Sequence, residues 1–170
     1  MTLSRQDRVE NLQAAVARLL DELGERAIDT VYFDPRNPSL ANVIATTWKE
    51  LVRQNVLREE GTLAGVDYRF TGDGWYVAMQ TTGRAANQSF VGSLSKISAA
   101  LKDSVKGRQE DGFVYADSLA TECNLSIDLV YNIIESGAIE KEFGGVGATW
   151  ADRQRGRLIR VPLDFGMKPL

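Results

Sequence analysis

The chain has 170 residues, no histidine, one cysteine and a formal net charge of −3 at pH 7. The lack of histidine excludes Ser-His-Asp and Cys-His catalysis and histidine-containing zinc sites. The single cysteine, Cys123, excludes an internal disulfide. No apolar run approaches the roughly 20 residues that a membrane span needs, and the charged start lacks a signal-peptide core. We therefore expect a cytoplasmic protein with no membrane partner.

Catalytic groups are sparse. No nucleophile and base form a recognisable pair, and no compact set of carboxylates stands out, so we expect a protein that is not an enzyme and holds no cofactor or metal ion. Charge is uneven along the chain: residues 1–83 and 84–150 each carry −3, whereas residues 151–170 carry +3. Because salt screens charges over about 10 Å, a local basic patch can bind nucleic acid on an acidic protein.

The chain opens with a predicted amphipathic helix over residues 4–23, which Gly24 ends. Its apolar residues recur at steps of three and four, which places them on one face. These residues are Val9, Leu12, Val16, Leu19, Leu20 and Leu23. The stripe either packs onto its own domain or forms the seam of a homodimer.

A short strand or turn is expected over residues 27–33, followed by a loop that contains Pro35 and Pro38. Ser39 is then expected to cap a helix that runs to about Asn55. This helix would carry Trp48 in the core and polar or basic side chains on its outer face. The outer residues are Asn42, Thr46, Lys49, Arg53 and Gln54.

A β-hairpin is predicted next, with strands over residues 56–59 and 67–70. Glu59 and Glu60 are expected at its tip, where they would repel phosphate. Thr71 is expected to cap a helix that follows the hairpin.

A small, polar stretch over residues 81–88 is the best domain boundary, and we divide the chain into residues 1–83 and 84–170. The second part is predicted to begin with a helix over residues 90–105. Its basic side chains are either a solvated face or a phosphate-contacting face. These side chains are Lys96, Lys102, Lys106 and Arg108.

Two short helices are predicted after this, over residues 117–123 and from the capping residue Ser126 to Gly137. A strand is expected over residues 139–143. The segments 148–152 and 157–161 are then expected to pair as a hairpin.

This hairpin carries the clearest candidate for binding. Arg153, Arg155 and Arg157 alternate, so on a strand they would share a face, and Arg160 follows. Guanidinium groups match phosphate oxygens and can enter a narrow minor groove. We therefore expect these four residues to contact double-stranded DNA. The alternative is an exposed hairpin whose charges pair with nearby acids such as Asp152.

The helix after Ser126 is the second candidate. Its expected outer face includes Tyr131 and Asn132, which could contact base edges, and Ser126 lies at its start. In the first half, Lys49 and Arg53 are the corresponding candidates. Asp128 and Glu135 are also expected on this outer face, which has no basic residue and is therefore poorly suited to reading the major groove. The alternative is that this helix is exposed or contacts a protein partner.

The segment "DSLATECNLSIDLVYNIIESGAIE" and the hairpin "ATWADRQRGRLIRVP" resemble bacterial winged helix-turn-helix proteins, and "TTWKELVRQNVLREE" with "DYRFTGDGW" resembles a second such unit. The resemblance implies a mainly α fold with small β-hairpins (α+β), in which two tandem winged-helix-like units are joined by a helix. It also implies a DNA-binding protein, either a transcriptional regulator or a DNA-associated accessory factor. The alternative is a protein–protein adaptor or assembly subunit, because winged helices also serve as docking modules.

Overall fold

The computed structural model describes residues 2–30, 32–152 and 157–169, and within them the fold is α+β. The described residues form seven α-helices and two three-stranded antiparallel sheets. The chain divides into two compact units, Met1–Ala85 and Ala86–Leu170. The division lies two residues beyond the boundary expected from the sequence.

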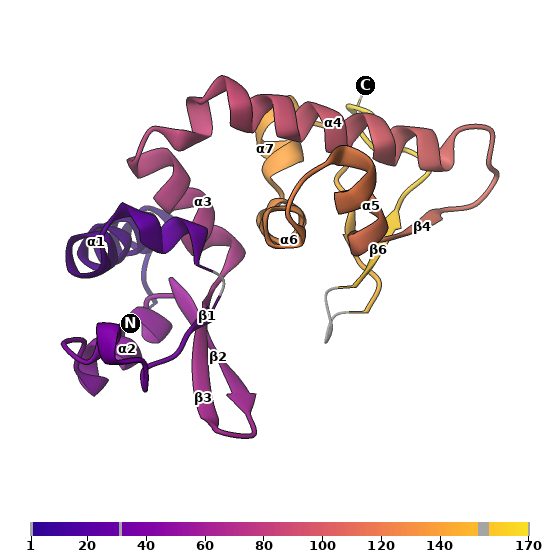
Figure 1. The fold of residues 1–170 in the computed structure, drawn as a ribbon. Helices are drawn as coiled ribbons and strands as arrows, with labels where there is room; N and C mark the ends of the chain where they lie inside the picture. The colour runs from indigo at the N-terminus through magenta and orange to yellow at the C-terminus, as the bar shows by residue number, and fades with distance from the viewer. Residues whose placement is uncertain (1, 31, 153–156, 170) are drawn as a thin grey trace. The chain divides into compact units, whose positions relative to one another are not determined.

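Unit 1 contains three α-helices and one sheet (Figure 1). Its elements are α1 (Arg5–Leu23), η1 (Glu25–Asp29), β1 (Tyr32–Phe33), η2 (Pro38–Leu40), α2 (Ala45–Arg53), β2 (Leu57–Thr62), β3 (Gly65–Phe70) and α3 (Gly72–Thr81). The strand order is β1-β3-β2, so the first strand pairs with the second strand of the hairpin. A short 3-10 helix, η3 (Arg84–Ala86), lies at the boundary.

The first helix confirms its predicted bounds. Its N-terminus is closed by a capping box, in which Ser4 Oγ accepts from the Asp7 N–H and the Asp7 carboxylate accepts from the Ser4 N–H. Val16 and Leu19 are buried in unit 1, where α1 packs against α3 and η1. Much of the apolar stripe therefore packs within its own unit, whereas Val9 remains about half exposed.

The single helix expected over residues 39–55 is wrong, because two helices occupy this segment. Asn37 caps η2 by accepting from the Ser39 N–H, so Ser39 lies inside the first turn. The chain then becomes extended at Ile44, and α2 starts at Ala45. Asn and β-branched residues between the two helices have low helix propensity, which favours a break.

The first hairpin is confirmed, but its tip differs from the expectation. Glu59 and Glu60 lie within β2, where Glu59 pairs with Tyr68 in the ladder. The strand register joins Thr62 to Gly65, so the loop is the apolar pair Leu63 and Ala64, and Leu63 is fully exposed. Thr71 caps α3 as predicted, since its hydroxyl accepts from the Gly74 N–H.

Unit 2 contains four α-helices and the second sheet. Its elements are α4 (Gln88–Val105), β4 (Gly112–Tyr115), α5 (Ala116–Cys123), α6 (Ile127–Ser136), α7 (Ala138–Phe143), β5 (Thr149–Trp150) and β6 (Leu158–Val161). The strand order is β4-β6-β5, which repeats the pattern of unit 1. Helix α4 packs against α5, α7, β4 and β6, so it belongs to the core of unit 2.

The strand expected over residues 139–143 is wrong, because this segment is helix α7. Gly137 adopts a left-handed conformation that ends α6, and the chain immediately starts another helical turn that buries Ala138 and Ile139. The first strand of this unit instead lies earlier, at Gly112–Tyr115.

Candidate nucleic-acid interface

The C-terminal hairpin forms as an antiparallel pair. Thr149 lies opposite Arg160, and Trp150 lies opposite Ile159. Ile159 and Val161 are fully buried, whereas Arg160 between them is exposed, so β6 has one core face and one outer face. Strand β6 is central in the sheet, which holds the Arg160 backbone between two neighbours.

The candidate arginines fall into different environments. Arg153 and Arg155 lie outside the described residues. Arg157 is exposed, and its backbone N–H, like that of Leu158, donates to the Asp152 carboxylate. The Asp152 side chain, which follows β5, therefore binds the backbone of Arg157 and of Leu158, the first residue of β6.

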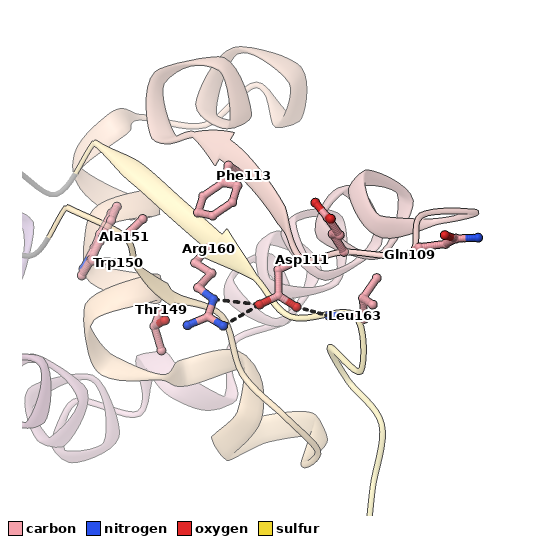
Figure 2. A pocket seen from close by; sticks show the side chains of 9 residues that line it. Gln109, Asp111, Phe113, Thr149, Trp150, Ala151, Arg160 and Leu163 are labelled. Carbon is pink, nitrogen blue, oxygen red and sulfur yellow. Dashed lines mark hydrogen bonds and ion pairs between the residues drawn. The ribbon is translucent and has the colours of Figure 1, made fainter.

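Arg160 is held by an acid rather than projecting alone. Its Nε and Nη2 atoms lie 2.8 Å and 2.6 Å from Asp111 Oδ2, and the Leu163 N–H donates to Asp111 Oδ1 at 3.1 Å. Figure 2 shows this fork beside Phe113, in a groove of about 680 Å³. A phosphate at Arg160 must therefore compete with an existing carboxylate partner.

The same fork lowers the pKa of Asp111, first through the Arg160 guanidinium and then through the Leu163 N–H. The depressed pKa means that this contact stabilises the fold above the ordinary aspartate pKa of about 4 and is lost as the pH falls below it. We expect Arg160→Gln to raise the pKa of Asp111 toward its ordinary value. A carboxyl ¹³C NMR titration of both proteins measures this shift, and an unchanged Asp111 titration would contradict the fork.

Helix α6 corrects the second prediction. Ser126 caps it as expected, because its Oγ accepts from the Leu129 N–H at 3.2 Å. Tyr131 and Asn132, however, are buried, with exposed fractions of 9% and 8%. Their expected position on an outer face of the helix is therefore wrong.

The reason is that α6 is packed along more than one side. It contacts α5, α7 and β5, so a ten-residue helix has few exposed positions. The Tyr131 ring stacks on Trp150 with centroids 5.1 Å apart, and Trp150 Nε1 donates to Glu135 Oε2 at 2.7 Å. Ile127 and Asp128 in the first turn remain exposed.

Helix α2 separates into two faces. Thr47, Trp48 and Leu51 are buried, whereas Lys49 and Arg53 are exposed. Trp48 is a core residue, since it stacks on Tyr68 with centroids 4.9 Å apart. The basic pair therefore lies on the outer face, where the sequence predicts it.

Only one member of this pair has an acidic partner among the described residues. Arg53 Nε and Nη2 donate to Glu50 at 2.9 Å and 2.7 Å. The Arg53 hydrogen bonds, followed by one from Gln54, lower the pKa of Glu50 to about 2. Glu50 is therefore charged throughout the physiological range, whereas Lys49 makes no ion pair with any described residue.

Two basic residues that the sequence did not single out lie near Arg53. Arg5 and Arg8 of α1 line a groove together with Arg53. Their spacing of three along a helix places them on one face, but nothing local indicates that Arg53, 45 residues later, lies beside them.

Over the described ranges, no group of three or more His, Cys, Asp or Glu residues is placed to hold a metal ion. No helix in the same part of the chain is long and apolar enough to cross a membrane. Comparisons of the chain with protein-family models, with curated proteins and with solved structures gave no match.

Proposed function

We propose that both units are winged helix-turn-helix modules and that the protein binds duplex DNA as a transcriptional regulator or DNA-associated accessory factor. The arrangement of each unit supports the fold assignment. In each, a long helix precedes the first strand, helical segments follow that strand, and a hairpin then adds its second strand to the first. The helical segments are η2 and α2 in unit 1, and α5, α6 and α7 in unit 2. That order is the one expected of a helix-turn-helix with a β-ribbon wing.

The observation that carries the DNA proposal is the two-faced helix α2. It occupies the position of a recognition helix in unit 1, directly before the hairpin, and it exposes Thr46, Lys49 and Arg53. Lysine and arginine supply the phosphate contacts that dominate DNA affinity, and threonine can contact phosphate or a base edge. In unit 2 the arginines of the C-terminal wing, of which Arg157 is exposed, would add contacts to the DNA phosphate backbone.

Helix α2 gives a direct test with a matched control. Fluorescence anisotropy with a random-sequence duplex over a salt series should show binding that weakens as salt rises. The variant Lys49→Gln/Arg53→Gln should bind about tenfold more weakly, with a salt slope reduced by about 2, because two phosphate contacts are lost. The control Arg26→Gln/Lys168→Gln removes one arginine and one lysine that are exposed elsewhere and should bind like the wild type.

Two results would count against the proposal. The absence of duplex binding at low salt would reject DNA as the partner. Equal binding by the α2 variant and the control would reject α2 as the site. Unchanged binding by Arg153→Ala/Arg155→Ala/Arg157→Ala would likewise remove the C-terminal wing from the interface.

A docking role is the second candidate, and the outer face of the sheet in unit 2 favours it. Phe113 and Tyr115 on β4 are 56% and 61% exposed, and the exposed first turn of α6 carries Ile127 and Asp128. Aromatic and apolar side chains are typical anchors of protein interfaces. A defined partner recovered with the wild type but lost with Phe113→Ser/Tyr115→Ser would support this role.

A homodimer through α1 also remains a proposal. Because Ala15, Val16 and Leu19 are buried in unit 1, a second copy would use the first turns of the helix around Val9. Sedimentation equilibrium of the wild type and Val9→Asp tests this interface.

A further inference from the structure

Unit 1 contains a groove of about 520 Å³. It shares only Arg53 with the outer face of α2 that is proposed to bind DNA. It is built by the start of α1, the end of α2 and the first turn of α3. Its lining residues are Leu3, Arg5, Arg8, Val9, Asn11, Leu12, Arg53, Gln54, Asn55 and Asp73.

Part of the lining is apolar and open to solvent. Leu3 and Val9 are 53% and 47% exposed, and Leu12 beside them is half-buried. Later in the same helix Val16 and Leu19 are almost fully buried by unit 1 itself. The apolar stripe of α1 thus continues past the core and into the groove, where no described element covers it.

The remaining lining is polar and carries a net positive charge. Three guanidinium groups and one carboxylate line the groove, although residues 1–83 carry a net charge of −3. Arg5 and Arg8 make no ion pair with any described residue. Arg53 binds Glu50 through Nε and Nη2, which leaves Nη1 without a hydrogen bond among the described side chains.

We propose that this groove binds an acidic amphipathic peptide segment of a partner protein. Apolar side chains of the segment pack on Leu3, Val9 and Leu12, and its carboxylates bind Arg5, Arg8 and Arg53. The apolar lining distinguishes this ligand from DNA, because a phosphate backbone would leave Leu3 and Val9 without an apolar partner. The proposal does not depend on whether α2 binds DNA.

The test uses the full chain and a fluorescein-labelled synthetic peptide composed of Leu, Phe, Asp and Glu. Anisotropy should show saturable binding that weakens with salt. Arg5→Glu/Arg8→Glu should reduce the affinity by about tenfold, because two attractive contacts become repulsive. Acidic residues near a helix N-terminus are favourable, so this variant should retain α1.

Three further measurements test the position of the charge change, the apolar lining and the charge of the peptide separately. Arg26→Glu/Arg108→Glu makes the same charge change at exposed sites outside the groove and should bind the peptide like the wild type. Val9→Gln leaves the charge unchanged but removes apolar lining, and should weaken binding about threefold. A peptide with Gln and Asn in place of Glu and Asp should lose most of its affinity.

The outcomes are decisive in both directions. The proposal is supported when Arg5→Glu/Arg8→Glu loses peptide binding but binds duplex DNA as the Arg26→Glu/Arg108→Glu control does. This holds also when neither variant binds duplex DNA. Equal peptide binding by the groove variant and its control would overturn it. Loss of duplex binding alone would also overturn it, because the groove would then be a phosphate site.

Discussion

Gly74→Ala is expected to destabilise unit 1 strongly and to leave the stability of unit 2 unchanged. An added Cβ at Gly74 would lie 2.3 Å from the Val56 carbonyl oxygen and 2.9 Å from the Val56 carbonyl carbon and Cα. These are backbone atoms of a fully buried residue, and the same carbonyl accepts a hydrogen bond from the Thr71 N–H. The clash can be relieved only by moving α3 away from the strand entry.

The expected cost is about 3 kcal/mol or more, the upper end of the range for overpacked cores. This is a large share of the stability that a unit of this size can have. Hydrogen–deuterium exchange with mass spectrometry resolves the two units, and protection should fall throughout Met1–Ala85 but not in Ala86–Leu170.

Gly92→Ala is the matched control. Gly92 lies inside α4, is exposed, and an added Cβ there meets no atom within 4 Å. Because alanine is the better helix former, this change should stabilise unit 2 by about 0.5–1 kcal/mol. Wild-type protection of unit 1 in Gly74→Ala would show that the close approach to Val56 is wrong.

Trp150→Ala is expected to destabilise unit 2 by about 2–4 kcal/mol, somewhat less than a fully buried tryptophan because Trp150 is partly exposed. Its ring stacks on Tyr131 at 5.1 Å with an interplanar angle of 26°, and its Nε1–H donates to Glu135. These contacts join β5 to α6. Losing them removes the packing that keeps Tyr131 buried.

Trp150→Phe distinguishes the contribution of ring stacking from that of the hydrogen bond donated by the indole N–H. It keeps an aromatic ring against Tyr131 but removes the indole N–H, so the expected loss is about 1 kcal/mol. Urea unfolding followed by far-ultraviolet circular dichroism, with hydrogen exchange to assign the transition to unit 2, measures both variants. Equal stability of the alanine and phenylalanine variants would contradict the stacking contribution.

Local signals in the sequence were sufficient for much of the fold. The hydroxyls of Thr71 and Ser126 cap α3 and α6 as predicted, and Gly24 and Gly137 end their helices. These devices work between residues three or four positions apart, so their effect can be read without knowing the tertiary structure. The outer-face position of Lys49 and Arg53 follows in the same way from helical periodicity.

The tertiary structure decided which helix faces remain exposed to solvent and which residues far apart in the sequence come into contact. Periodicity placed Tyr131 and Asn132 on an outer face, but β5 and neighbouring helices cover that side of α6. The segment 139–143 became helix α7, because its packing against α4 and α6 outweighs the weak strand preference of so short a segment. The Asp111–Arg160 fork joins residues 49 positions apart, and the Arg5, Arg8 and Arg53 groove joins two helices. Such non-local contacts depend on how the elements pack, and no local pattern of residue types specifies them.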